Sequence, residues 1–212
     1  GLSIVQAPKQ NNGTRSMPHF YQKLETLGYT AMEAAGFSLG HPIVASAACL
    51  AYKKDLFFQV GGFGDLINLS SGDDDMLIHK MMKIPGTKVC YNLDKDAVIE
   101  TAPVHTWKQL FNQRARWSSN GTNYESKAYI LMLTLIYTYY IWMFISPWCV
   151  AFLDCPWQWS VFSILPKFIV DFIFLSIASW KLHSKRRMFA FLPVELIQIP
   201  MIVFCVPAGI SG

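Results

Sequence analysis

Three consecutive carboxylates, Asp73, Asp74 and Asp75, open an apolar run that has the spacing of a helix. The helix dipole favours negative charge in a first turn, which is a structural explanation sufficient for one of them. Three in a row exceed what capping requires. A positioned carboxylate can also act as a general base that takes the proton from an attacking hydroxyl. The run is therefore the first candidate for chemistry.

A second candidate group lies about 40 residues later, where Gln113, Arg116 and Trp117 stand at i, i+3 and i+4. On a helix this spacing places an amide, a guanidinium and an indole on one face. A guanidinium suits a phosphate and an indole can stack on a sugar ring, so the two groups suggest a site for a sugar with an anionic leaving group. A helix lying at a membrane surface explains the same residues without a ligand.

The neighbours of these groups are predicted to be structural. We expect Trp107, Phe111 and Ala115 to line the other side of that helix, and Arg114 to be a solvated neighbour of the Gln113 surface. The lone histidines, His79 and His105, are expected to have structural roles.

The elements that must position the two groups alternate between short strands and helices in the first part of the chain. Apolar and β-branched runs predict strands, and apolar residues at helical spacing predict helices. Gly61 and Gly62 end one of these helices because a Gly pair supplies positive φ. The expected strands are Leu2–Ala7, Pro42–Tyr52 (buried), Lys88–Tyr91 and Ala97–Thr101; the expected helices are 18–36, Lys53–Val60, one from Asp73, and Thr106–Asn120.

The last part of the chain predicts two or three transmembrane helices, about residues 129–153, 160–180 and 188–207. The first run has 25 residues without a charge, longer than the roughly 20 needed to cross a bilayer. Pro193 and Pro200 interrupt the third, which could be re-entrant instead. The basic loop between the second and third runs could attract nucleic acid, but between apolar segments it favours anionic lipid headgroups and a cytoplasmic position. The basic residues of this loop are Lys181, Lys185, Arg186 and Arg187.

Charged residues inside these apolar runs need partners. Lys167 and Asp171 stand at i, i+4 in the second run, so they can form an ion pair that joins packed helices or, less simply, lines a substrate path. Glu195 in the third run is open to the same two explanations. Five scattered cysteines without paired spacing indicate neither a disulfide framework nor a zinc site.

The order of the motifs resembles one family. Gly72-Asp73-Asp74-x-x-Leu77 followed by Gln113-x-x-Arg116-Trp117 and apolar helices, with Val60-Gly61-Gly62-Phe63 upstream, resembles the membrane-bound family 2 glycosyltransferases. Cellulose, hyaluronan and ceramide-glucoside synthases are relatives of that kind. The resemblance is detailed over residues 1–125 and general beyond them.

The resemblance implies an α/β fold: residues 1–104 as the later part of a GT-A-type catalytic domain, 105–127 as an interfacial helix, and 128–212 as the transmembrane region. It implies inverting transfer from a nucleotide-sugar donor to a saccharide or lipid acceptor. Asp74 would be the base with Asp73 in support. Arg116 would neutralise the diphosphate, Gln113 would bond the diphosphate or acceptor, and Trp117 would stack on the acceptor sugar. Gly61 and Gly62 would lie near the acceptor.

The resemblance also implies a Mg²⁺ or Mn²⁺ cofactor held by an upstream Asp-x-Asp. The chain has no such pattern upstream of residue 73, and the position of Asp73–Asp75 matches the base motif, so no metal ligand is assigned here. We therefore expect a carboxy-terminal fragment that lacks the donor-nucleotide half and is inactive alone. The expected location is the plasma or inner membrane with the catalytic part in the cytoplasm, and the expected partners exclude nucleic acid.

Two alternatives belong to other classes. One is a fragment of a transporter or channel, with Lys167, Asp171 and Glu195 lining a path beside a cytosolic regulatory domain. The other is a membrane scaffold in which the acidic run binds cations. The enzyme hypothesis requires Asp74 and the surface of Gln113, Arg116 and Trp117 to face one pocket.

Overall fold

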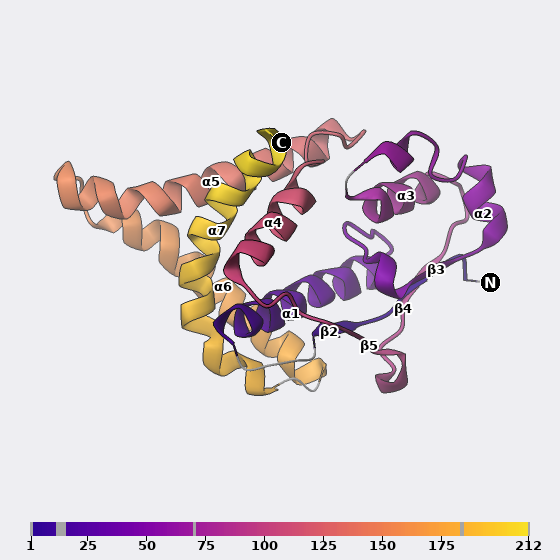
Figure 1. Ribbon diagram of the computed structural model, residues 1–212, viewed down its shortest axis with the longest axis horizontal. Coiled ribbons are helices and arrows are strands. Elements are labelled where there is room, and N and C mark those ends of the chain that lie inside the picture. Colours follow the sequence, from indigo (N-terminus) through magenta and orange to yellow (C-terminus); the bar gives the residue numbers. More distant parts are fainter. Residues whose placement is uncertain (1, 12–15, 70, 183–184, 212) are drawn as a thin grey trace. The chain divides into compact units, whose positions relative to one another are not determined.

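The computed structural model describes residues 2–11, 16–69, 71–182 and 185–211. The chain forms two compact units, Gly1–His105 and Thr106–Gly212, and most of its regular structure is helical (Figure 1). The first unit holds two small sheets with helices beside them. The second is built from helices.

The first unit confirms short strands within Leu2–Ala7, Lys88–Tyr91 and Ala97–Thr101 and adds one, Lys9–Asn11, that was not expected. In one sheet β1 (Ile4–Gln6) lies between β3 (Leu50–Tyr52), which is antiparallel to it, and β4 (Val89–Tyr91), which is parallel. In the other sheet β2 (Lys9–Asn11) pairs in parallel with β5 (Ile99–Thr101). The sheets therefore join the beginning of the chain to segments about 90 residues later.

Helix α1 (Met17–Ser38) provides much of the apolar core of the first unit. It packs on β2 and β4, and its Leu24 and Leu27 are each 1% exposed. Proline near its beginning is tolerated because the first amides of a helix have no intrahelical partner. The predicted helix over 18–36 is confirmed.

The prediction of a buried strand over Pro42–Tyr52 is wrong for most of its length. Only β3 at its end is a strand, preceded by a short 3₁₀ helix, η1 (Ala47–Cys49). The amides of Ala45 and Ala47 donate to side-chain carboxylates rather than to a neighbouring strand. Because these amides already donate to carboxylates, they do not donate to a neighbouring strand, and the segment does not extend the sheet.

The next two helices agree with those predicted from the sequence. Helix α2 (Lys54–Gln59) ends before Gly61 and Gly62, whose φ angles are 78° and 60°, as expected for a left-handed turn. Helix α3 (Asp73–Met82) begins at the acidic run. Two further 3₁₀ turns complete the unit: η2 (Gly64–Asn68) and η3 (Lys95–Ala97).

The second unit begins with α4 (Trp107–Ser118), which a capping box between Thr106 and Gln109 starts. Three helices follow that are long and apolar enough to cross a membrane. They belong to α5 (Lys127–Phe152), α6 (Gln158–Lys181) and, after η4 (Lys185–Ala190), α7 (Phe191–Ser211). Helix α7 continues through Pro200. Part of the predicted basic loop, residues 183–184, lies outside the described residues.

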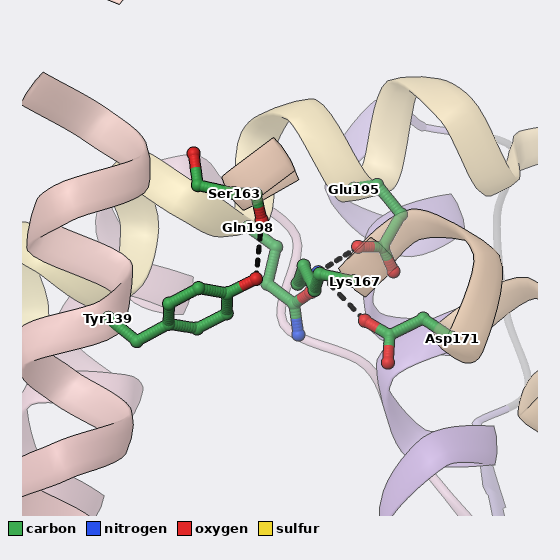
Figure 2. A network of polar contacts seen from close by, with 6 residues as sticks. All are labelled: Tyr139, Ser163, Lys167, Asp171, Glu195 and Gln198. Atoms are coloured by element: carbon green, nitrogen blue, oxygen red, sulfur yellow. Dashed lines mark hydrogen bonds and ion pairs between the residues drawn. The ribbon is translucent and has the colours of Figure 1, made fainter. Parts of the chain in front are cut away.

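The ion pair expected within α6 forms, and it extends to α7 (Figure 2). Lys167 Nζ lies 2.8 Å from Asp171 Oδ2, pairs with Glu195 Oε2, and donates to Gln198 Oε1 at 2.9 Å. The Lys167 and Glu195 side chains are 7% and 3% exposed. Charges this deeply buried are tolerated only when they are paired, so one ammonium group joins the two helices.

Lys167→Met should therefore destabilise the second unit. Removing one partner of a buried ion pair costs about 3–5 kcal/mol because the remaining carboxylates lose their counter-ion. We expect a lower melting temperature in detergent, measured by circular dichroism. Lys181→Met, at an exposed position at the end of α6, is the matched control. Equal melting temperatures for the two variants would contradict a role for Lys167 in joining α6 to α7.

Candidate active site

Two of the three carboxylates are anchored by backbone amides. Asp74 Oδ2 accepts from the amide of Ala47 at 3.0 Å, and its Oδ1 accepts from the amide of Asp75 at 3.0 Å. Asp75 Oδ1 accepts from the amide of Ala45 at 2.6 Å. These bonds to the segment 45–47 fix the beginning of α3 and hold the Asp74 carboxylate in one orientation.

Asp73 differs from its neighbours. Within the described part of the chain no hydrogen bond or ion pair reaches its side chain, which is half-exposed. The preceding residue, Gly72, caps α3 in the left-handed conformation with φ 79°. The acidic run thus offers two anchored carboxylates and one that can reorient.

The segment that supplies the amides is itself held by polar side chains of the first sheets. The Gln6 side chain, fully buried, donates to the carbonyl of Ser46 at 3.2 Å and accepts from its amide at 3.5 Å. Lys9 Nζ donates to Ser46 Oγ at 3.0 Å. The position of Asp74 therefore depends on β1 and β2 through residues 45–47.

A fourth carboxyl group, Glu33 of α1, is electrostatically coupled to this region and was not predicted from the sequence. It is 4% exposed, and burial raises its pKa to about 8; Lys9 opposes this rise, while Asp75 and Asp74 add to it. Burial likewise raises the pKa of Tyr91. Tyr91 lowers the pKa of Glu33 and Glu33 raises the pKa of Tyr91, so the two buried side chains interact. The sequence contains no signal of the burial of Glu33, since it shows only a charged residue within the predicted helix over 18–36.

Helix α4 carries the second candidate group. Arg116 is exposed, and Gln113 and Trp117 are half-buried. The prediction for Arg114 is wrong, because this residue is 7% exposed rather than solvated. Its Nη1 donates to Gln113 Oε1 at 2.6 Å, and its guanidinium carbon lies 4.0 Å from the centre of the Trp117 ring.

The opposite side of α4, with the predicted Phe111 and Ala115, packs on α7, a partner that the sequence did not predict (Figure 1). Cys205 Sγ lies 3.7 Å from the carbonyl oxygen of Phe111. One turn later, a Cβ added to Gly209 would lie 2.0 Å from the carbonyl oxygen of Ala115. The backbones of the two helices thus approach so closely at Gly209 that no side chain fits there.

The remaining residues singled out in the sequence are His79, Gly61 and Gly62. His79 Nε2 lies 3.0 Å from the carbonyl oxygen of Ile43, which agrees with a structural role. Gly61 and Gly62 form the turn after α2, and their place near an acceptor stays a prediction. No group of three His, Cys, Asp or Glu residues in the described ranges is arranged to hold a metal ion.

The comparison with protein families decides the class. A family described as glycosyl transferase family 21 matches residues 19–205, which include both candidate groups and most of the apolar helices. The chain belongs to glycosyltransferase family 21. A search for similar curated proteins found no match.

This family 21 assignment confirms a transferase of sugars with helices suited to a membrane. The motifs suggested family 2, which the match to family 21 does not specifically show. The shared pocket stays a prediction, because Asp74 belongs to the first unit and Gln113, Arg116 and Trp117 belong to the second.

Gly209→Ala should displace α4 from α7. Overpacking typically costs about 1–3 kcal/mol, and contact with a backbone oxygen leaves little room to adjust. We expect a lower melting temperature and faster proteolysis within residues 107–118. Gly121→Ala, whose added Cβ would meet nothing closer than 3.4 Å, is the control. If Gly209→Ala behaves like Gly121→Ala, the close approach of the two helices is wrong.

Glu33 should make stability depend on pH. The folded protein holds its proton up to about pH 8, whereas the unfolded chain releases it near 4.5. The folded state therefore binds more protons between these values, and the free energy of unfolding should fall by up to a few kcal/mol as the pH rises through this window.

The test compares melting temperatures from pH 5 to pH 9. Glu33→Gln should reduce the decline and melt higher than the wild type at pH 9. Glu100→Gln, at an exposed position on β5, should leave the decline unchanged. An identical decline in wild type and Glu33→Gln would show that Glu33 does not hold the proton.

Proposed function

We propose that this protein transfers a sugar from a nucleotide-sugar donor to a saccharide or lipid acceptor, with inversion, at the cytoplasmic face of a membrane. The observation that carries the proposal is the family 21 match, which spans the acidic run and the Gln-x-x-Arg-Trp helix together. The catalytic part is proposed to be a GT-A-type domain of which residues 1–104 form the later portion.

In the proposed reaction the acceptor hydroxyl oxygen attacks the anomeric carbon of the donor. The bond from that carbon to the phosphate oxygen breaks, and the nucleoside diphosphate leaves with the bonding electrons. The proton of the hydroxyl passes to the carboxylate of Asp74. Asp74 suits this role because two amides hold its carboxylate in place while the residue remains partly exposed.

Helix α4 is proposed to serve the leaving group and the acceptor. The exposed guanidinium of Arg116 would stabilise the charge that develops on the diphosphate, Gln113 would bond the diphosphate or acceptor, and Trp117 would stack on the acceptor sugar. These roles require the two units to place Asp74 and α4 at opposite walls of one pocket.

The Mg²⁺ or Mn²⁺ implied by the resemblance does not fit the residues described here. The acidic run is the nearest candidate, but its Asp74 and Asp75 carboxylates accept backbone amides, and no group of three potential ligands occurs in the described ranges. No step of the proposed reaction passes through a metal ion.

An asparagine scan of the acidic run in the full-length protein tests the base. Purified protein in lipid nanodiscs is given UDP-glucose, UDP-galactose or UDP-N-acetylglucosamine with ceramide, diacylglycerol or a short oligosaccharide. Asp74→Asn should lower kcat about 10²–10⁴-fold, the range for removing a general base. Asp73→Asn should have a smaller effect, and Asp75→Asn should chiefly lower stability.

The outcomes separate the alternatives. A larger loss for Asp73→Asn or Asp75→Asn than for Asp74→Asn would move the base to that residue. Full transfer by all three variants would remove the carboxylates from the mechanism. Transport of solute by the Asp74→Asn protein, with no sugar transfer by the wild type, would favour the transporter alternative.

A further inference from the structure

The side chain of Arg114 occupies a position that the Gln-x-x-Arg-Trp motif leaves variable. It is nevertheless the most buried residue among positions 113–117, at 7% exposed. A buried cation is tolerated when it is paired and hydrogen-bonded, and Arg114 contacts two residues of the motif itself. These contacts are its hydrogen bond to Gln113 and its stacking on Trp117.

The contact with Gln113 fixes the direction of the amide. A guanidinium can only donate hydrogen bonds, so the Gln113 atom 2.6 Å from Arg114 Nη1 must be the carbonyl oxygen. The amide nitrogen then lies on the other side of the group. Within the described part of the chain, no hydrogen bond uses this nitrogen. Gln113 therefore presents two N–H donors.

The contact with Trp117 fixes the plane of the indole. Arg114 and Trp117 stand at i, i+3 on α4, and the guanidinium carbon lies 4.0 Å from the ring centre, within the range of a cation–π interaction. A planar guanidinium stacks on an aromatic face and donates in its own plane at the same time, which an ammonium group cannot do. One side chain thus orients both neighbours.

We propose that Arg114 is a positioning residue that holds Gln113 and Trp117 in the orientation for binding the acceptor substrate. In this orientation the amide nitrogen of Gln113 donates a hydrogen bond to that substrate. This inference rests on the proposed function and makes it more specific: the atom of the acceptor substrate that meets Gln113 accepts a hydrogen bond, as a hydroxyl oxygen does. The other variable position, Ala115, has a different task, because it lies against Gly209 of α7.

Arg114→Lys is the decisive variant because it keeps the charge and removes the planar fork. For the acceptor from the panel above that supports turnover, we expect KM to rise at least about tenfold, as for loss of a charge-assisted hydrogen bond, while kcat changes much less. Lys108→Met, at an exposed position on the same helix, is the control and should keep both constants.

Gln113→Glu tests the direction of the amide. Its carboxylate can still accept from Arg114, but it replaces the outward donor with an acceptor oxygen. We expect the KM for the acceptor to rise at least as much as in Arg114→Lys while the melting temperature stays the same. An unchanged KM in Gln113→Glu would overturn the assignment of Gln113 as a donor.

A spectroscopic measurement tests the stacking without any need for activity. The emission of Trp117 is isolated from that of the other six tryptophans by subtracting the spectrum of the matching Trp117→Phe variant. Arg114→Lys should shift or strengthen this difference spectrum, and Lys108→Met should not. No change in the spectrum, or a loss of melting temperature with KM unchanged, would overturn the positioning role.

The two measurements also separate this inference from the proposed function. If the wild type transfers no sugar from any donor of the panel, the proposed function fails, and the difference spectrum alone decides whether Arg114 orients Trp117. If the wild type is active and the Arg114→Lys protein matches it in KM, the proposed function stands and the inference on Arg114 fails.

Discussion

Donation from the amides of Ala45 and Ala47 to the carboxylates of Asp75 and Asp74 is the interaction on which the first unit depends. It ties the beginning of α3 to a segment that would otherwise continue as a strand. That segment is held in turn by Gln6 and Lys9 of the sheets. A carboxylate proposed to accept a proton is thereby fixed by backbone groups, whose positions vary less than those of side chains.

Packing between backbones positions α4 in the second unit, whereas hydrogen bonds position α3 in the first. Helix α4 rests on α7 through Phe111 and Ala115, with Gly209 allowing the closest approach. This contact leaves the other face of α4 for Gln113, Arg114 and Trp117, which form a cluster of their own. The proposed acceptor-binding face therefore lies on a helix whose other side packs against α7, a helix long and apolar enough to cross a membrane.

Much of this arrangement follows from local patterns in the sequence. Apolar residues at helical spacing predicted α1 and α3, and the length of the apolar runs predicted the long helices. The i, i+4 spacing predicted the Lys167–Asp171 pair. The failures have a common cause. The strand at Pro42–Tyr52 and the solvated Arg114 were judged from residue type alone, whereas the structure depends on which partner each amide or cation finds. Such partners, 27 or 30 residues away for the amides of Ala47 and Ala45, leave no periodic signal.

The cluster around Lys167 bears on the order of events in biogenesis. Helix α6 carries Lys167 and Asp171 together, so it can enter a bilayer with its charges already matched. Helix α7 carries Glu195, whose counter-ion belongs to α6. If α7 entered the lipid alone, the Glu195 carboxylate would lie in hydrocarbon without a counter-ion, which is energetically costly. Pairing with α6 removes this cost. The two helices are thus suited to leave the translocon together as a hairpin, in which Lys167 of α6 supplies the counter-ion for Glu195 of α7.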